Sequence, residues 1–136
     1  MKPYQHKVQY YETDQMQITN HTNYIRFMEE ARSDFLEQIG WPYNKLEEQG
    51  IISPVVSVNC KYKHTTGYPD LITIKTAVTK VSRVKLTLAY TMKVDEKIVC
   101  TAESSHCFLD QAGQILDVKT QFPEFYQTLV DLQAAD

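Results

Sequence analysis

Two short segments near the N-terminus hold the residues best placed for chemistry. The first is Tyr11-Glu12-Thr13-Asp14, and the second is Thr19-Asn20-His21, which we predict to open a helix. A helix start presents unpaired backbone N–H groups and a partial positive charge. A carboxylate beside such donors can attack a carbonyl carbon or activate water. The pair is therefore suited to carbonyl chemistry, with Asp14 as the carboxylate and the backbone N–H of His21 holding a developing oxyanion.

Both residues also have a purely structural interpretation, and residue type alone does not decide between the two. Aspartate is common in turns because its side chain accepts hydrogen bonds from nearby backbone N–H groups. A single histidine in the first turn of a helix is equally ordinary. The position of Asp14 directly before a helix start is what favours a functional role.

The motifs that carry other kinds of catalysis are missing from the sequence. There is no HExxH motif and no Cys/His cluster, so we predict no metal site, although Asp14, His21 and Glu29 or Glu30 could in principle be ligands. The chain also lacks the GxSxG, P-loop and GxGxxG patterns. Its three cysteines show no CxxC spacing and are interpreted as reduced residues of strands: Cys60, Cys100 and Cys107.

The elements that must position these residues can be predicted from hydrophobic periodicity. Asn20 or Thr19 can cap a long helix whose apolar residues recur at helical spacing up to about Ile39, where Gly40 follows. A short strand is predicted before it, at His6–Thr13. Alternating residues then predict four strands and a last helix: Val56–Lys63, Ile72–Val78, Lys85–Val94, Ile98–Leu109, and Pro123 to about Leu132.

One long helix followed by a run of antiparallel strands predicts an α+β fold, with the helix on one face of the sheet. A length of 136 residues predicts a single domain, residues 1–136. The net charge of −3 argues against a nucleic-acid partner. No apolar run is long enough to span a membrane, and the first residues lack the apolar core of a signal peptide. We therefore expect a cytoplasmic protein.

Taken together, these motifs resemble the signature of the hotdog-fold acyl-CoA thioesterases. The similarity rests on Tyr11-x-Thr13-Asp14, His21, Tyr24 and Glu30-Ala31-Arg32, and it covers nearly the whole chain. Within that superfamily the chain is similar to the 4-hydroxybenzoyl-CoA thioesterase-like group, which includes the Tol-Pal-cluster thioesterases. One departure is Gln17, which stands where relatives commonly have glycine.

The resemblance implies a sheet wrapped around the long helix and a homodimer or homotetramer with active sites between subunits. It also implies hydrolysis of an acyl-CoA thioester to a free acid and CoA, without metal or organic cofactor. Carried over by position, Asp14 would be the catalytic carboxylate, acting as nucleophile or general base. The backbone N–H of His21 would polarise the thioester carbonyl, with the His21 ring nearby.

Contacts with the substrate are predicted at two places. Tyr24 could line an acyl pocket, although its spacing is also that of a core residue. CoA carries several phosphate charges, so a local basic cluster is needed in this acidic chain. We predict that cluster at Lys80, Ser82, Arg83 and Lys85, where the alternative is a solvated edge that protects the sheet from aggregation.

Two other functions use the same sequence features. The first is hydrolysis of an acyl group from acyl carrier protein, an acidic partner that the Lys80–Lys85 edge could dock. The second is a non-catalytic acyl-CoA-binding module, in which Asp14 would have no effect on function. The identity of the acyl group cannot be predicted from the chain.

Overall fold

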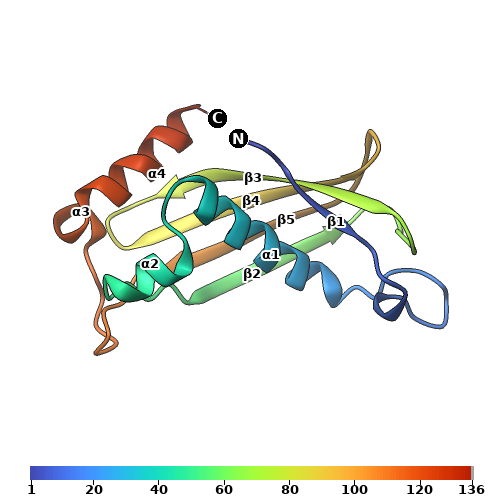
Figure 1. Ribbon diagram of the computed structural model, residues 1–136, viewed down its shortest axis with the longest axis horizontal. Coiled ribbons are helices and arrows are strands. Elements are labelled where there is room, and N and C mark those ends of the chain that lie inside the picture. Colours follow the sequence, from blue (N-terminus) through green and yellow to red (C-terminus); the bar gives the residue numbers. More distant parts are fainter. Residues whose placement is uncertain (136) are drawn as a thin grey trace.

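A computed structural model describes residues 1–135 and contains one five-stranded antiparallel sheet (Figure 1). The order of strands across it is β1-β3-β4-β5-β2. Apolar side chains alternate along the central strands, which confirms the predicted α+β class. The strands are bounded as follows: β1 Tyr4–Lys7, β2 Val55–Tyr62, β3 Leu71–Val81, β4 Lys85–Val94 and β5 Lys97–Cys107.

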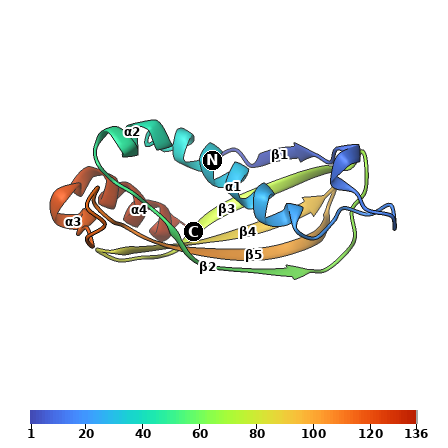
Figure 2. The same ribbon diagram turned by 90° about the horizontal axis from the view of Figure 1, so that it is seen from below.

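The long helix α1 (Asn23–Gln38) lies against one face of this sheet, and Figure 2 shows β1 rising beside it at the sheet's edge. The periodic apolar residues predicted to form its core face are the ones that are buried. Shorter helices follow at α2 (Tyr43–Glu48), α3 (Val118–Gln121) and α4 (Pro123–Ala135), and α4 packs against β3. Among residues 1–135, no helix is long and apolar enough to cross a membrane.

Two of the predicted boundaries that were wrong lie beside the predicted site. The first strand ends at Lys7 rather than Thr13, and the chain then forms a short 3-10 turn, η1 (Tyr10–Glu12). The Glu12 carboxylate accepts a hydrogen bond from the Gln9 backbone N–H at 2.7 Å, which bends the chain away from the sheet. Helix α1 begins at Asn23 rather than directly after Asn20, so His21 lies in the turn that precedes the helix.

The two ends of the sheet are structurally distinct. At one end lie the segment between β1 and α1 and the segment between β2 and β3, which the Thr19 N–H···O Thr66 hydrogen bond of 2.8 Å joins. The tight β3–β4 turn and α3 lie at the other end, joined by the Val118 N–H···O Arg83 hydrogen bond (Figure 1). Strand β2 forms one edge, with β5 as its only neighbour in the sheet of residues 1–135.

Candidate active site

The segment between Glu12 and Asn20 closes on itself as a small loop, here called the 12–20 loop. The Asn20 N–H donates to the Glu12 carbonyl at 2.8 Å, Thr13 and Thr19 form a β-bridge, and the Asp14 N–H donates to the Ile18 carbonyl at 3.0 Å. These pairings hold Asp14 beside Ile18, three residues before His21. The loop therefore brings both predicted residues to the same end of the sheet.

Asp14 is half-buried, and its carboxylate is only partly engaged. Oδ1 accepts the Met16 backbone N–H at 2.8 Å, which is the local turn contact that aspartate often makes. The other oxygen, Oδ2, has no hydrogen-bond or ion-pair partner within residues 1–135. The carboxylate makes no hydrogen bond to His21 either. One oxygen thus has a structural role, and the second is available to a ligand.

The backbone N–H of His21 has no acceptor among the described residues. The Asn20 side chain takes the neighbouring N–H of Thr22 at 3.0 Å and its hydroxyl at 2.6 Å. The His21 carbonyl accepts the Tyr24 N–H at 3.2 Å and the Tyr62 hydroxyl at 3.3 Å. The residue is therefore held through its carbonyl, while its N–H stays free to donate.

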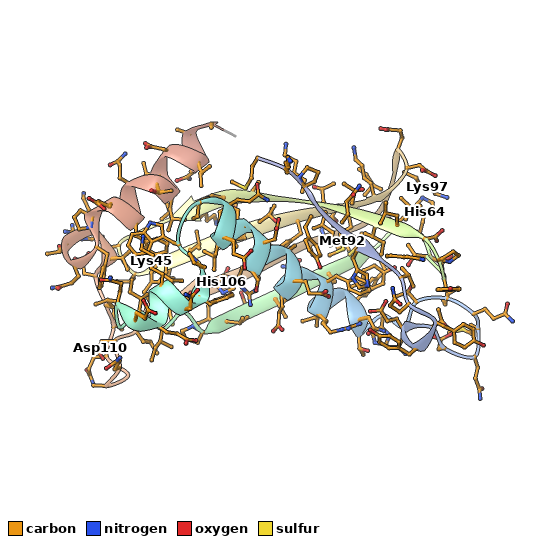
Figure 3. The ribbon with its side chains drawn as sticks, in the orientation of Figure 1. Lys45, His64, Met92, Lys97, His106 and Asp110 are labelled. Carbon is orange, nitrogen blue, oxygen red and sulfur yellow. The ribbon has the colours of Figure 1, made fainter. Side chains whose placement is uncertain are left out.

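His21 lines a cleft of about 250 Å³ between the 12–20 loop, the start of α1 and the end of β2. Its lining includes Ile18, His21, Tyr24, Tyr62 and His64. The His21 ring stands edge-on to the Tyr62 ring, with 6.0 Å between centroids. Figure 3 shows His64 at this end of the molecule. Three of the five, Ile18, Tyr62 and His64, were not predicted as site residues, and the last two reach the site from the end of β2 only in the folded chain.

Tyr24 forms a wall of this cleft. It is buried, and its hydroxyl hydrogen-bonds with Thr66 Oγ1 at 2.8 Å, which in turn bonds to Thr19 Oγ1 at 2.6 Å. Burial raises the pKa of the Tyr24 phenol. At neutral pH it is a neutral group whose hydroxyl is already in use, so it can shape a ligand site but has little left to donate.

Gln17 has a backbone conformation that favours glycine, the residue that the family resemblance implies at this position. Its φ is +65°, in the left-handed region that glycine enters without steric cost. Its N–H closes the turn by donating to the Asp14 carbonyl at 2.9 Å. The turn therefore keeps its geometry with glutamine, at the expense of some backbone strain.

Glu12, two residues before Asp14, has an entirely different environment. It is 1% exposed, and its carboxylate is bound by His6 Nε2 at 2.9 Å, by the Gln9 N–H and by the Arg26 guanidinium. Burial alone would raise its pKa, but these hydrogen bonds and the charge of His6 outweigh it and lower the pKa below the ordinary value of 4.5. Glu12 joins β1 to α1 and has no lone pair left for chemistry.

The basic cluster predicted to bind CoA lies at the opposite end of the sheet (Figure 1). Strand β3 has 11 residues and separates the two ends by about 35 Å. Arg83 pairs with Asp117 at 2.9 Å, and the Ser82 hydroxyl accepts the Val84 and Lys85 N–H groups of the turn. Within one chain, the structure does not bring Lys80, Ser82, Arg83 or Lys85 together with Asp14 and His21.

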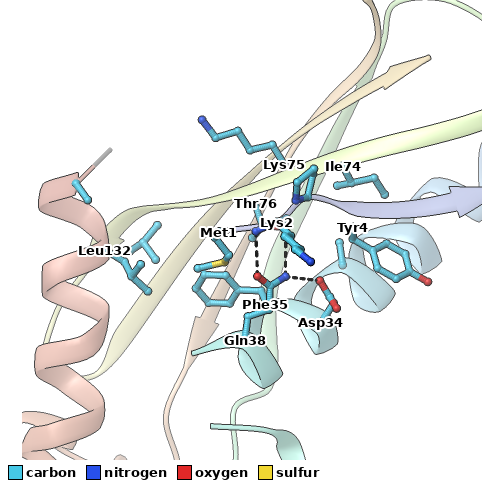
Figure 4. A pocket seen from close by; sticks show the side chains of 14 residues that line it. Met1, Lys2, Tyr4, Asp34, Phe35, Gln38, Ile74, Lys75, Thr76 and Leu132 are labelled. Carbon is cyan, nitrogen blue, oxygen red and sulfur yellow. Dashed lines mark hydrogen bonds between the residues drawn. The ribbon is translucent and has the colours of Figure 1, made fainter. Parts of the chain in front are cut away.

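A second cleft, of about 340 Å³, is bounded by the N-terminal segment, α1, β3 and α4 (Figure 4). Its central polar group, Gln38, is fully used: the side chain accepts the Lys2 N–H at 3.0 Å and donates to the Lys2 carbonyl and to Asp34. Within residues 1–135, no cluster of His, Cys, Asp and Glu has the geometry of a metal site.

Comparison with known proteins places the geometry in a family. A family model described as the Thioesterase-like superfamily matches residues 8–130. A protein of Aquifex aeolicus, provisionally named an esterase, is 32% identical over 121 residues, covering 89% of this chain and 94% of that protein. A Bacillus subtilis protein, provisionally named acyl-CoA thioesterase YneP, is 30% identical over 122 residues and covers 88% of each chain.

Solved structures of related proteins have the same fold. The DHNA-CoA thioesterase of Staphylococcus aureus superposes with a TM-score of 0.91 at 29% identity, covering 98% of this chain and 91% of that one. A protein of Aquifex aeolicus gives 0.85 at 31% identity, covering 91% of this chain and 98% of that one. The hotdog fold is thereby confirmed, whereas the narrower Tol-Pal resemblance stays a prediction. The chain belongs to the thioesterase-like superfamily and is a hotdog-fold thioester hydrolase.

Proposed function

We propose that the chain hydrolyses an acyl-CoA thioester to a free acid and CoA, with Asp14 and the backbone N–H of His21 as its machinery. The observation that carries this proposal is that His21, whose N–H has no acceptor in residues 1–135, lines a cleft beside a loop that holds a carboxylate oxygen without a partner in the same residues. The relative named as an acyl-CoA thioesterase and the neighbour named as a DHNA-CoA thioesterase support CoA as the carrier.

The chemistry suits so small a set of groups. In the proposed reaction, the thioester carbonyl oxygen accepts the His21 N–H as it gains negative charge. A preorganised donor of this kind lowers the barrier by roughly 3 kcal/mol. The thiol leaves as a thiolate without strong acid help, because an ordinary thiol has a pKa of about 8.5. Water supplies the OH of the acid, and its remaining proton goes to the thiolate.

Asp14 has two possible roles in that reaction. It can take a proton from the attacking water, or it can attack the carbonyl itself to give a mixed anhydride that water then opens. Single turnovers in ¹⁸O-labelled water detect the second route when water attacks the aspartyl carbon, because Asp14 then gains the label. An anhydride that water opens at the acyl carbon leaves Asp14 unlabelled, as the general-base route does, and trapping the anhydride with hydroxylamine separates those two.

The proposal is tested by Asp14→Asn, with release of CoA thiol followed from a panel of short, long, branched and aromatic acyl-CoAs. Turnover should fall by a factor of about 10³, within the range for loss of a general base, while the circular dichroism spectrum is unchanged. The matched control is Asp131→Asn, which changes an exposed aspartate of α4. Full activity in Asp14→Asn would overturn the proposed mechanism. If the wild-type protein bound acyl-CoAs but released no thiol, the result would indicate the non-catalytic module.

Hydrolysis of acyl carrier protein thioesters remains the second candidate for the carrier. It predicts faster turnover of the protein-bound thioester, with an advantage that salt reduces because docking would use the Lys80–Lys85 edge. Comparing kcat/KM for the two thioester forms of one acyl group, at low and high salt, decides between them. A cytoplasmic location stays a prediction.

We further propose that the chain works as a homo-oligomer through the free edge of β2. That edge exposes Val55, Val56, Val58 and Tyr62, whose exposed fractions are 44%, 51%, 39% and 47%. An apolar edge strand of eight residues with unpaired backbone groups is a template for another strand. Because β2 also ends at the proposed active site, a second copy paired along it would reach that cleft.

A further inference from the structure

Arg32, on the third turn of α1, is a half-buried cation without an acidic partner in the described chain. Its Nε donates to the Tyr43 hydroxyl at 2.6 Å, and no carboxylate of residues 1–135 lies within ion-pair distance of it. Burial alone would lower its pKa, but the hydroxyls of Tyr43 and Tyr90 outweigh that effect and keep the guanidinium charged. A partly buried charge is costly unless it is paired.

A cavity of about 140 Å³ lies beside Arg32, between α1 and β2. Its apolar sides come from Ile25, Met28, Val55 and Val58, and Ser104 lines it as well. Ser104 is 1% exposed, and its hydroxyl hydrogen-bonds with Tyr90 and with His106, at 2.8 Å each. Figure 3 shows where His106 lies.

The neighbouring titratable groups supply no negative charge to Arg32. Burial, with a further contribution from the charge of Arg32, lowers the pKa of His106 to about 4, so this histidine is neutral at pH 7. Burial raises the pKa of Tyr90, which is therefore also neutral. The one carboxylate that lines the cavity is Glu29, an exposed residue one turn before Arg32, and it does not reach Arg32 within the described chain.

Two-fold symmetry at the β2 edge would supply the missing carboxylate. If β2 pairs antiparallel with its own copy over its whole length, Val55–Tyr62, the axis passes the middle of the strand, between Val58 and Asn59. Val58 lines the same cavity as Glu29 and Arg32, so the axis runs close to this part of α1. The two copies of α1 then run antiparallel to each other across the axis. Because the interface is symmetric, any contact of Glu29 in one subunit with Arg32 in the other occurs twice.

We propose that Glu29 of the partner subunit enters this cavity and pairs with Arg32, and that the reciprocal pair forms at the same time. The inference rests on the pairing through β2 proposed above. It names the side chains that set the register of that interface: the two ion pairs form only when the strands are centred on one another. The valines of β2 would exclude water from the pairs and strengthen them.

The test uses two charge reversals, Glu29→Lys and Arg32→Glu, with Glu37→Lys as the matched control on the exposed face of the same helix. Each reversal alone places like charges opposite each other twice in a homodimer. Its dissociation constant, measured by analytical ultracentrifugation, should rise by at least about tenfold. The control should not change it. Circular dichroism establishes that each variant is folded.

Mixing the two reversed chains separates pairing between chains from pairing within one. In the mixed dimer, the introduced lysine of one chain would face the introduced glutamate of the other, and the native Arg32 would face the native Glu29. Both pairs are thereby restored, so native mass spectrometry should show the heterodimer in excess over either homodimer. A statistical mixture, or unchanged homodimers, would overturn the inference. If Arg32→Glu does not fold, Glu29→Gln and Arg32→Met replace the reversals, and losses that simply add in the double variant overturn it.

Two further outcomes also count against the inference. Acetate that tightens the Glu29→Gln dimer to the wild-type value would show that the cavity takes a free carboxylate instead. A wild-type chain that stays monomeric at all concentrations would remove the interface altogether. The inference is measured by dimer dissociation and the proposed hydrolysis by thiol release in Asp14→Asn, so failure of one is distinguishable from failure of the other.

Discussion

Glu12 and Asp14 are two residues apart in one short motif, yet their carboxylates differ in burial and in hydrogen bonding. Glu12 is buried and bound by a histidine, an arginine and a backbone N–H, whereas Asp14 is half-buried with one oxygen unengaged in residues 1–135. The backbone repeats the contrast. The Asn20 N–H is bound to the Glu12 carbonyl, while the next N–H, that of His21, has no acceptor in the same part of the chain. Glu12 and the Asn20 N–H stabilise the fold, whereas Asp14 and the His21 N–H each keep a polar atom that can contact a ligand.

After the loss expected for Asp14→Asn, the largest effect should come from removing the free N–H of His21. His21→Pro deletes the proposed oxyanion donor, whereas His21→Ala keeps it and removes only the ring. We expect kcat to fall by roughly 10²–10³ in the proline variant and by far less in the alanine variant. Thiol-release assays on folded variants measure both. Equal losses would show that the ring, rather than the N–H, matters.

The next effect tests the contribution of the buried Glu12 carboxylate to stability. Glu12→Ala leaves Arg26 and His6 without their shared carboxylate, and we expect it to lower the free energy of unfolding by about 3 kcal/mol. Asp14→Asn should change that free energy by less than about 0.5 kcal/mol. Urea denaturation of the two variants makes the comparison. A similar loss of stability in both would mean that Asp14 is also structural.

Lowering the pH should show the contribution of Glu12 to stability as a smaller change in the free energy of unfolding. Because the pKa of Glu12 is lower in the folded chain than its ordinary value of 4.5, the unfolded chain binds more protons in this range. Its contribution to stability is present above the unfolded pKa and is lost as the pH falls through the folded one. The decrease in unfolding free energy from about pH 5 to about pH 3 should therefore be smaller in Glu12→Gln than in the wild type. An identical decrease would contradict the assignment.

The smallest effect concerns the turn within the 12–20 loop that the Gln17 N–H closes on the Asp14 carbonyl. Gln17→Gly should raise the free energy of unfolding by up to about 1 kcal/mol, since it removes the strain of a side chain at a φ of +65°. Flexible glycine in the unfolded chain offsets part of that gain. Thermal unfolding measures the change, and Gln15→Gly, at an exposed position in the same loop, is the control. A loss of stability at Gln17 would show that its side chain is needed.

Much of the architecture could be predicted from periodicity. The long helix, the alternating strands and the end of the helix near Gly40 depend on local pattern, and the structure has them close to where they were expected. The two misplaced boundaries depend on polar side-chain contacts that hydrophobic spacing does not show. Where β1 ends, the Glu12 carboxylate binds the Gln9 N–H, His6 and Arg26, and the last of these lies 14 positions away. Before the helix, the Asn20 side chain accepts the Thr22 N–H.

The site was predictable only in part, for the same reason. Asp14 and His21 are near each other in sequence, so a local motif could select them, although their catalytic roles remain a proposal. Tyr62 and His64 reach the cleft from the end of β2, and the Lys80–Lys85 cluster is carried to the far end of the sheet by the length of β3. Sequence spacing does not measure such distances.

The sequence by itself determined the fold class, the family and a carboxylate, Asp14, in the segment that leads to the long helix. These follow from hydrophobic period and short motifs, which act within a few residues of the chain. Only the tertiary structure decided that Glu12 is buried while Asp14 keeps a free oxygen, and that no carboxylate of residues 1–135 lies within ion-pair distance of Arg32. Burial and pairing depend on side chains brought together from β1, α1, β2 and β5, and that convergence exists only once the sheet has closed around the helix.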